Sequence, residues 1–446
     1  MRTYHWAQLD ASARRAVLAR PAQQAQAQIL ADVRAIVADV RRDGDAALSA
    51  YTLRLDGVAL ERSAVGAAEF AAARTRLNAS QLTALRRAIA NVETFHAAQR
   101  LAPLAIETMP GVRCERTVRP IDAVGLYVPA GSAPLPSAVI MLAVPARLAG
   151  CAQRVLCTPP GPDGAAHPAV LVAAELCGIE TVFKIGGAQA IAALAYGTQT
   201  VPKVDKIFGP GNAWVTAAKQ LVAGDPGGAA CDLPAGPSEV LVLADETARA
   251  ELVAADLLAQ AEHDAHSQAL LVTPSVRLAE AVAHAVEAQA RALTRQRILK
   301  ESLAASRCIV VSDLAAGIAV VNEYAPEHLL LQVSEPRRQL DAIRNAGSIF
   351  VGEWSAEPLG DYCSGTNHVL PTYGYARAYS GLSTLDFVKR ITVQELTAEG
   401  LRALGPLAAT LAELEGLDAH AAAVTRRLAI LEAETAQHSV QPRGGH

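Results

Sequence analysis

The sequence predicts an α/β fold with two doubly wound, Rossmann-like parallel-sheet domains and additional helical segments at the N- and C-termini. The first observation behind this prediction is an alternation of short β-branched runs and Ala-rich helical runs, with Gly- and Pro-containing turns between them. The second is that strand, turn and helix repeat four times between residues 120 and 223. The third is a further alternating stretch at 239–351, which requires a second sheet.

Length and composition limit the class of protein. At 446 residues the chain is too long for one ordinary core, and 51% hydrophobic residues with only 4% aromatic residues favour packed helices. The net charge of -4 provides no basic field for a phosphate backbone, so nucleic acid is not expected as a partner. The 7 cysteines are scattered without a C-x-x-C pair, and no signal peptide or long apolar stretch is visible. These features predict a cytoplasmic protein that does not associate with a membrane.

The regions outside the two sheets are expected to be helical. Residues 22–100 carry apolar residues at helical spacing almost throughout. Residues 340–347 are expected to form a short helix within the second α/β stretch. From residue 383 the pattern is helical again, beginning with the run TVQELTAEGL, and it ends in a polar tail at 439–446.

Two turns after predicted strands could hold an anionic ligand. Parallel sheets bind ligands beyond the carboxyl ends of their strands, and free N–H groups at a helix start attract anions such as a pyrophosphate. Gly186 and Gly187 lead into a helix beside Gln189, and 209–212 form a similar turn that ends at Asn212. Neither turn is a G-x-G-x-x-G motif, so a purely structural role for the glycines is the more common interpretation of either turn alone.

Three polar residues could share a metal ion. Gln260 and His263 stand three residues apart in a predicted helix, hence on one face, and Asp361 lies in a Gly-rich loop after a predicted strand. Taken alone, a surface Gln–His pair and a turn-capping Asp are the more common explanations. His368 lies in the same loop as Asp361, where it could support a site or only hydrogen-bond the loop.

Glu327 and His328 form an adjacent carboxylate and imidazole at the start of a predicted strand. Such a pair could remove protons from a substrate, although adjacent Glu–His pairs also occur by chance on ordinary surfaces. His420 begins a predicted C-terminal helix with Asp418 as its expected cap. In isolation, a solvated histidine in a first turn is the simpler interpretation of His420.

Eight ordered motifs together resemble one known family, the histidinol dehydrogenases. The motifs are VGLYVPAGSAPLPS (124–137), IGGAQAIAALAYGT (185–198), KIFGPGNAWV (206–215), LPAGPSEVLV (233–242), LLAQAEHD (257–264), NEYAPEHL (322–329), GDYCSGTNHVLPT (360–372) and EGLDAHAAAV (415–424). The resemblance runs from about residue 25 to residue 430. Eight blocks at the spacing of the family are far more specific than any one of them.

The resemblance implies two cofactors and the residues that bind them. One Zn²⁺ per subunit and NAD⁺ are expected. The implied NAD⁺ contacts are Tyr127, Gln189 and Asn212. The implied zinc ligands are Gln260, His263, Asp361 and, from the other subunit of a homodimer, His420.

The resemblance also implies the reaction. The family oxidises L-histidinol to L-histidine through L-histidinaldehyde with two NAD⁺, the final steps of histidine biosynthesis, in a site shared between two subunits. The implied acid/base residues are Glu327 and His328. The implied substrate contacts are Ser238, Gln260, His263, Glu327, His328, Asp361, Glu415 and His420.

The domain organisation is expected to follow the family. The expected divisions are an N-terminal helical arm at 1–21, a discontinuous α/β domain with the zinc and acid/base residues at 22–126 plus 238–382, an inserted NAD-binding Rossmann-like domain at 127–237, and a C-terminal helical dimerisation segment with tail at 383–446.

Few positions depart from the pattern of the family. Cys363 and Leu233 stand where Ala and Met are expected, and the run DAHS at 264–267 differs from the commoner run after the zinc histidine. Cys363 leaves open a rival chemistry, aldehyde oxidation through a cysteine thiohemiacetal. A metallohydrolase and a non-catalytic binding protein are further rivals, but the first lacks H-E-x-x-H and the second does not explain an intact set of acid/base and ligand residues.

Overall fold

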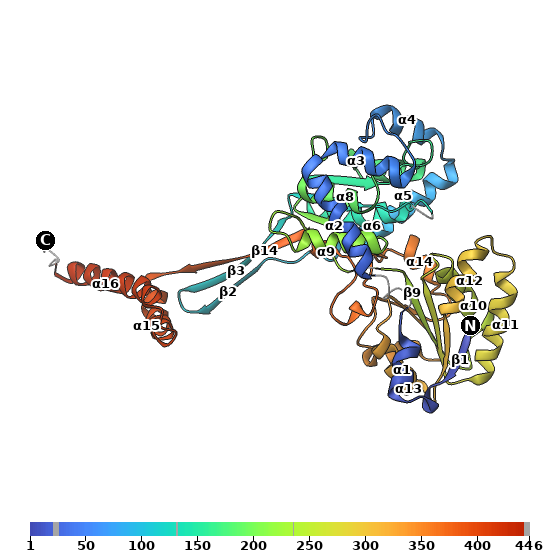
Figure 1. The fold of residues 1–446 in the computed structure, drawn as a ribbon. Helices are drawn as coiled ribbons and strands as arrows, with labels where there is room; N and C mark the ends of the chain where they lie inside the picture. The colour runs from blue at the N-terminus through green and yellow to red at the C-terminus, as the bar shows by residue number, and fades with distance from the viewer. Residues whose placement is uncertain (21–25, 131–132, 235, 441–446) are drawn as a thin grey trace. The chain divides into compact units, whose positions relative to one another are not determined.

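The computed structural model describes residues 1–20, 26–130, 133–234 and 236–440. Within these residues the chain forms two compact units. The first unit comprises Met1–Arg100 and Ile121–Phe387, and the second comprises Leu101–Pro120 and the chain from Val388 onward. Two parallel sheets lie in the first unit (Figure 1), which confirms the predicted fold class.

The larger sheet of the first unit has, among the described residues, six strands whose neighbours are all parallel. In spatial order they are β1 (Arg2–His5), β11 (Arg307–Val310), β10 (Gln268–Thr273), β9 (Glu239–Ala244), β12 (His328–Gln332) and β13 (Ser348–Val351). The central strands read as continuous apolar runs because helices cover both faces (Figure 1). One face packs against α10 (Ala250–Ala261), α11 (Val276–Ala290) and α12 (Gln296–Ala305), and the other against α1 (Ala11–Leu18) and α13 (Leu314–Tyr324).

The smaller sheet has five parallel strands in the part of the chain that the structure describes. In spatial order they are β6 (Thr181–Lys184), β5 (Gln153–Thr158), β4 (Ala123–Tyr127), β7 (Lys206–Phe208) and β8 (Ala230–Cys231). One face packs against α4 (Ala67–Thr75), α5 (Ala79–Ala97), α6 (Pro136–Ala149) and α7 (Pro168–Leu176), and the other against α2 (Gln26–Asp43), α3 (Asp45–Tyr51), α8 (Gly187–Tyr196) and α9 (Ala213–Ala223). The strand order reverses between β4 and β7, where a doubly wound sheet opens its binding crevice.

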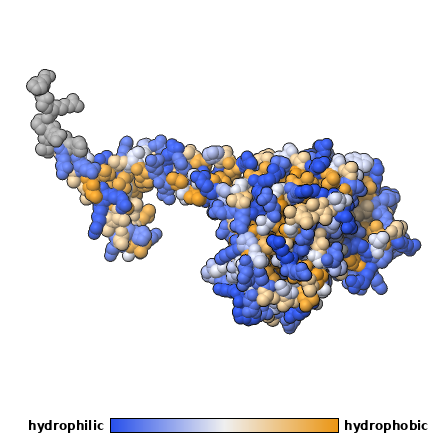
Figure 2. Space-filling view, turned by 90° about the horizontal axis from the view of Figure 1, so that it is seen from above, coloured by the Kyte–Doolittle hydropathy of each residue, from blue (hydrophilic) through white to orange (hydrophobic). Residues whose placement is uncertain are grey.

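The second unit contains an antiparallel sheet and two helices. The strands lie in the order β14 (Val388–Leu396), β3 (Val112–Pro120) and β2 (Leu104–Met109), and α15 (Ala398–Leu414) packs against α16 (Asp418–Val440). Leu407, Leu411 and Leu414 follow one another at helical spacing on α15 and are 60%, 61% and 78% exposed. Figure 2 shows such hydrophobic surface on this unit.

Three local predictions differ from the structure. The run TVQEL is part of strand β14, because its β-branched residues pair with β3, a strand that the helical pattern did not anticipate. The predicted helical arm at 1–21 is helical in α1, but Arg2–His5 form edge strand β1. The predicted helix at 340–347 is instead a short 3-10 helix at Pro336–Ala342.

The remaining short elements are a π-helical turn at Thr52–Asp56, helix α14 at Glu357–Tyr362, and 3-10 turns at Trp6–Gln8, Tyr375–Arg377 and Thr384–Phe387. Parts of three predicted features, the polar tail and the motifs at 124–137 and 233–242, lie outside the described residues. Among the helices of the described residues, none combines the length and the hydropathy needed to cross a bilayer.

Candidate active site

The predicted metal ligands of the first unit come from the ends of two helices. Gln260 lies in the last turn of α10, and His263 lies just beyond the helix end, where its N–H donates to the Gln260 carbonyl at 3.2 Å. Asp361 lies in α14, with Oδ2 at 3.8 Å from His263 Nε2. The structure therefore brings together His263 and Asp361, which are distant in sequence.

Gln260 is fully buried, and neither its amide oxygen nor its amide nitrogen has a hydrogen-bond partner among the described residues. Buried polar groups in native proteins are nearly always paired, so an orphaned amide at the end of α10 requires an explanation. An amide oxygen that binds a cation supplies one.

Sequence reasoning missed Glu357, which lies one turn before Asp361 on α14. Ligand atoms of His263, Glu357 and Asp361 all lie within 4.8 Å of one another. The signal that could have revealed Glu357 is its four-residue spacing from Asp361, since Pro358 favours a helix start at this place.

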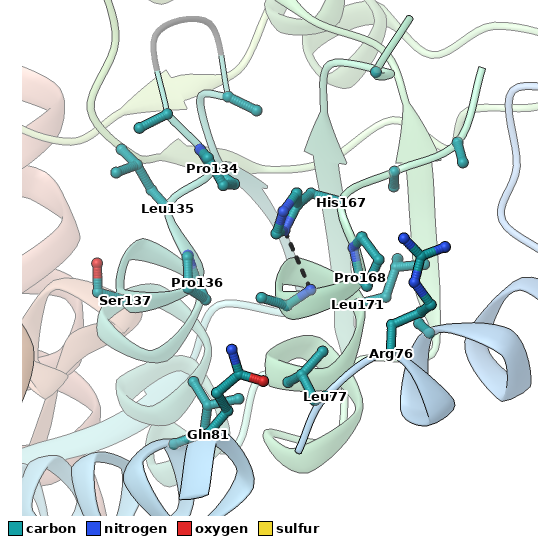
Figure 3. A pocket seen from close by; sticks show the side chains of 18 of the residues that line it. Arg76, Leu77, Gln81, Pro134, Leu135, Pro136, Ser137, His167, Pro168 and Leu171 are labelled. Atoms are coloured by element: carbon teal, nitrogen blue, oxygen red, sulfur yellow. Dashed lines mark hydrogen bonds between the residues drawn. The ribbon is translucent and has the colours of Figure 1, made fainter. Parts of the chain in front are cut away.

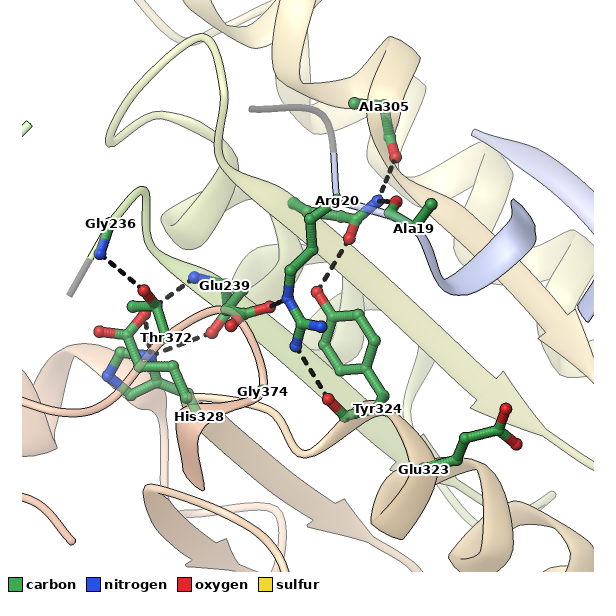
Figure 4. A network of polar contacts seen from close by, with 12 residues as sticks. Ala19, Arg20, Gly236, Glu239, Ala305, Glu323, Tyr324, His328, Thr372 and Gly374 are labelled. Atoms are coloured by element: carbon green, nitrogen blue, oxygen red, sulfur yellow. Dashed lines mark hydrogen bonds and ion pairs between the residues drawn. The ribbon is translucent and has the colours of Figure 1, made fainter. Parts of the chain in front are cut away.

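Glu327 directly precedes β12 and His328 is its first residue; both are buried and contact the backbone of Glu239, the first residue of β9. Figure 4 shows His328 beside Glu239. Glu327 Oε2 accepts a hydrogen bond from the Glu239 N–H at 2.8 Å, and His328 Nδ1 lies 3.2 Å from the Glu239 carbonyl oxygen. A carbonyl only accepts, so Nδ1 carries a proton and Nε2 is the atom that can exchange one. His328 Nε2 lies 3.4 Å from Asp361 Oδ1, so the predicted acid/base residues Glu327 and His328 lie next to the metal-directed cluster, as we call the predicted metal ligands of the first unit.

Burial and charge shift the pKa values of this cluster. Burial raises the pKa of Glu327 to about 8, against the opposing effect of His328. Burial by itself lowers the pKa of His328, but Glu327 and Asp361 outweigh it and raise that pKa to about 10. Burial by itself raises the pKa of Asp361, but the adjacent His328 outweighs this effect and holds the pKa of the carboxyl well below its usual range. His328 and Asp361 therefore form an ion pair.

Glu239 is itself held by a buried polar network that sequence reasoning did not identify (Figure 4). Its Oε2 accepts from Arg20 Nε at 2.6 Å, and the Arg20 guanidinium also donates to the Tyr324 carbonyl at 2.8 Å while lying over the Tyr324 ring. Tyr324 donates in turn to Gln268 at 2.9 Å. These contacts fix the start of β9, and through it Glu327 and His328.

The loop that follows α14 is tied to the same region. His368 Nδ1 donates to the backbone carbonyl of Asp361 at 2.7 Å, so His368 supports the loop that carries Asp361. Just before β9, the Gly236 N–H donates to Thr372 Oγ1 at 2.6 Å. A Cβ on Gly236 would overlap the ring of Tyr373, whose own φ of 54° is rare for a non-glycine residue.

The cluster lies at the amino ends of β9 and β12, because Ser238 and Glu327 directly precede these strands. The candidate residues of the larger sheet therefore lie at the edge opposite to the carboxyl ends, in agreement with the predicted position of Glu327 and His328 at a strand start. Asp361 belongs to this edge because the chain that follows β13 brings its carboxylate to 3.4 Å from His328, the first residue of β12. Ser238, the predicted substrate contact, is half-buried at this edge.

At the smaller sheet, the predicted NAD⁺ contacts do lie at carboxyl ends. Tyr127 is the last residue of β4, is buried, and its hydroxyl accepts from the Gly187 N–H at 3.0 Å. Gln189 is 1% exposed, and its Oε1 has no partner within the described ranges. Asn212 is exposed and caps α9 by accepting two N–H bonds at 3.1 Å. A Cβ on Gly209 would overlap the Tyr127 carbonyl oxygen, so this glycine brings the ends of β4 and β7 together.

A cavity of about 1300 Å³ opens beside this sheet (Figure 3). It is lined by the segments that follow β4 and β5, including Pro134 and His167, and by α4 and α5. Tyr362 and Cys363, which directly follow Asp361, also line it. The cavity thus extends from the smaller sheet to the residues beside the metal-directed cluster, although Tyr127, Gln189 and Asn212 are not among its lining residues.

Two predicted residues belong to the second unit. Glu415 directly follows α15, and His420 lies in the first turn of α16, where Asp418 is the first helical residue rather than the cap. Both side chains are exposed. Their roles toward substrate and zinc stay predictions.

The two parallel sheets, with buried imidazoles and carboxylates at an edge of one, define an α/β enzyme with acid–base groups. A model of the histidinol dehydrogenase family matches residues 18–428. Over 430 residues the chain is 55% identical to a histidinol dehydrogenase of Xanthomonas oryzae pv. oryzae, covering 96% of this chain and 100% of that protein. Over 432 residues it is 53% identical to one of Vibrio cholerae, covering 97% and 99%.

A solved structure agrees with the sequence comparison. The crystal structure of histidinol dehydrogenase from Elizabethkingia anophelis matches with a TM-score of 0.93 at 45% identity, covering 97% of this chain and 99% of that one. The chain belongs to the histidinol dehydrogenase family, and it is an oxidoreductase.

Proposed function

We propose that the chain oxidises L-histidinol to L-histidine through L-histidinaldehyde, with two NAD⁺ and one Zn²⁺ per subunit. The observation that carries this proposal is the position of Asp361, which lies between His263 and the His328–Glu327 pair. One carboxylate thus joins the residues suited to a cation with those suited to proton transfer.

The residues of the cluster fit a zinc ion. Gln260, His263 and Asp361 offer an amide oxygen, an imidazole nitrogen and a carboxylate oxygen, and the unpaired amide of Gln260 is explained by such a ligand. Zinc is d¹⁰ and has no redox role, so when bound it would supply orientation and charge stabilisation.

His328 would accept the hydroxyl proton of the alcohol on Nε2 as a hydride leaves the same carbon for NAD⁺. Glu327 would activate the water that adds to the aldehyde, and His328 would then act on the resulting hydrate for the second hydride transfer. Of the carboxylates that raise the pKa of His328, Asp361 is a proposed zinc ligand, and a cation bound to it would lower that pKa toward the range of a general base.

The smaller sheet would bind the dinucleotide. Its carboxyl edge carries Tyr127, Gln189 and Asn212, and the unpaired Oε1 of buried Gln189 is the strongest support for a ligand there. The NAD-binding domain that we propose includes the predicted insertion at 127–237, but it is larger than predicted, because α2–α5 also pack against the smaller sheet and β4 is one of its strands.

We further propose a homodimer in which His420 reaches the zinc of the partner subunit and Glu415 contacts its substrate. The exposed leucines on α15 support an interface, since Leu407, Leu411 and Leu414 form an apolar stripe. Replacement of Leu411 by Lys should yield monomers in sedimentation experiments, and these monomers should be inactive. Fully active monomers would contradict a shared site.

The central experiment follows NADH at 340 nm per L-histidinol consumed, before and after chelation. We expect two NADH per substrate, loss of activity with the chelator and recovery with zinc. One NADH per substrate would contradict the four-electron reaction. Turnover of another alcohol with no turnover of histidinol would contradict the substrate.

A further inference from the structure

Glu357 is the most deeply buried unexplained charge-bearing group near the active site. Its side chain lies on α14 and is 1% exposed, and neither carboxylate oxygen has a hydrogen-bond partner among the residues that the structure describes. A carboxyl buried without a partner costs several kcal/mol, by the order of magnitude that applies to buried polar groups and ions. Such a cost indicates that a partner is missing, and the question is which partner fits.

The position of Glu357 points to the metal-directed cluster. Glu357 and Asp361 are four residues apart on α14, so they lie on one face of the helix. One oxygen of each, together with a ring nitrogen of His263, lies within 4.8 Å of the others. The unpaired amide of Gln260 lies on the neighbouring helix, α10, which packs against α14. Three potential ligands thus lie close together, and a fourth, Gln260, lies on a helix that packs against α14.

The charges around Glu357 favour a cation over an anion or a neutral group. The groups that act on Glu357 include three carboxyls, those of Asp361, Glu327 and Asp256, and one imidazole, that of His328. The side chain of Asp256 is also buried, and no Lys or Arg acts on Glu357 among these groups. An excess of carboxylates in a buried site is stabilised by a divalent ion.

A zinc site that acts on a substrate must keep exchangeable positions for it. Gln260, His263 and Asp361, with the partner subunit's His420, account for the fixed ligands that we propose, and the amine and imidazole nitrogens of histidinol require further positions on the ion. A buried carboxylate within reach can occupy one such position while the substrate is absent. Because its carboxylate has no hydrogen-bond partner in the part of the chain that the structure describes, Glu357 is available for this role.

We propose that Glu357 is an exchangeable ligand of the active-site metal: one of its carboxylate oxygens binds the cation in the substrate-free enzyme and is displaced when a nitrogen of the substrate binds. This inference rests on the proposed zinc-dependent function. It assigns to Glu357 a role in metal retention and substrate exchange rather than in hydride transfer.

The test measures zinc affinity rather than turnover. Full-length wild type, Glu357→Gln and the control Glu262→Gln are stripped of metal and titrated with zinc against a chromophoric chelator, without NAD⁺, in the absence and presence of saturating L-histidinol. Glu262 is adjacent to His263 in sequence, and Glu262→Gln removes the same charge as Glu357→Gln. Glu262 is not a member of the group formed by His263, Glu357 and Asp361. Circular dichroism and thermal unfolding verify that each variant is folded.

We expect Glu357→Gln to bind zinc about 10-fold or more weakly than wild type without histidinol, in the range for loss of a group that supports a metal site. With histidinol the difference should shrink to about twofold, since substrate nitrogens replace the carboxylate, and Glu262→Gln should match wild type in both conditions. Wild-type affinity in Glu357→Gln without histidinol overturns the proposal. A loss that histidinol does not reduce overturns the exchange.

Two further outcomes are distinguishable. If the wild type binds no zinc, the proposed function is wrong. If the wild type binds zinc and Glu357→Gln binds it equally well, only the proposed role of Glu357 is wrong. If Glu357→Gln does not fold, Glu357→Asp keeps the charge and shortens the side chain. That variant should then show an intermediate affinity without histidinol, and wild-type affinity in it would overturn the proposal.

Discussion

Buried polar side chains beside the two parallel sheets differ in whether they have a hydrogen-bond or ion-pair partner. In the smaller sheet, Lys219 and Asp232 have side chains that are 8% and 1% exposed, and they pair with each other, while Lys219 also donates to the Gly209 carbonyl at 3.0 Å. Beside the larger sheet, Gln260 and Glu357 are just as buried and have no hydrogen-bond partner among the described residues. The comparison suggests that the Lys219–Asp232 pair maintains the fold, whereas Gln260 and Glu357 are positions where a ligand could supply the missing partner.

The candidate site residues of the two sheets also lie at opposite edges. The polar groups of the smaller sheet gather at the carboxyl ends of its strands, and those of the larger sheet at the amino ends of β9 and β12. At the smaller sheet, the buried side-chain oxygens Thr158 Oγ1 and Gln189 Oε1 have no hydrogen-bond partner among the described residues, and the second belongs to the predicted NAD⁺ contact Gln189. Gln189 occupies the edge where the dinucleotide is proposed, so in both sheets an unpaired buried group lies at a proposed ligand position.

The largest effect is expected from Asp361→Asn, which removes the charge that contacts both His263 and His328. We expect kcat to fall about 1000-fold, at the upper end for loss of one electrostatic group in a site. Bound zinc should fall as well, and metal analysis of the folded variant measures this loss. A variant that keeps its zinc and more than a tenth of its activity would contradict the proposed role of Asp361 as a zinc ligand.

A comparable effect on stability rather than activity is expected in the smaller sheet. Lys219→Met leaves Asp232 buried without its partner, which should lower the free energy of unfolding by about 3–5 kcal/mol. Urea unfolding followed by fluorescence measures this. Arg338→Met, which breaks the exposed pair with Glu335, is the matched control and should change stability little. Equal effects in the two variants would show that the buried pair is not a fold-maintaining element.

The third prediction separates the two steps of the reaction. Glu327→Gln keeps the size of the side chain but removes the base for water, so turnover of L-histidinaldehyde should fall about 100-fold. The first hydride transfer from histidinol should fall far less. Single-turnover measurements with each substrate provide the comparison, and equal losses in both steps would refute the division of labour between Glu327 and His328.

The smallest effect concerns a paired buried group. His96 is fully buried, its Nδ1 donates to the Val92 carbonyl at 2.9 Å, and its Nε2 lies 3.2 Å from the side-chain amide of Asn367. Burial lowers the pKa of His96, so below about pH 6.5, the usual histidine value, the unfolded chain binds a proton that the folded protein does not. Stability should therefore fall with decreasing pH in this range.

The variant His96→Gln, which cannot be protonated, tests this assignment. Denaturant unfolding of wild type and variant between pH 5 and 8, the interval in which histidines titrate, should show a weaker loss of stability at low pH in the variant. Identical slopes in the two proteins would show that other groups account for the pH dependence.

Much of the fold followed from local pattern. The alternation of strands and helices predicted both parallel sheets, because buried parallel strands and their helices are long, apolar and local in sequence. Strand β14 was missed because its partner β3 lies more than 250 residues earlier, and pairing over that separation leaves no local signal. The edge strand β1 was missed for the same reason.

The candidate site was predictable only in part. The spacing of Gln260 and His263 suggested a shared ligand, but the proximity of Asp361 and His328 depends on how α14 returns to the amino edge of the larger sheet. Glu357 and the Arg20–Glu239 pair emerged only from the three-dimensional contacts. Without the family resemblance, local pattern would not have distinguished these residues from ordinary surface or turn positions.

The contact of Gly236 with Tyr373 bears on how such an enzyme can be redesigned. The chain passes from the smaller sheet to the larger one through this point, where a side chain cannot be accommodated and the N–H is held by Thr372. Replacing the smaller-sheet region by that of another protein would therefore require a junction upstream of Gly236. A junction placed downstream would replace the glycine and misplace Glu239, on which the acid/base pair depends.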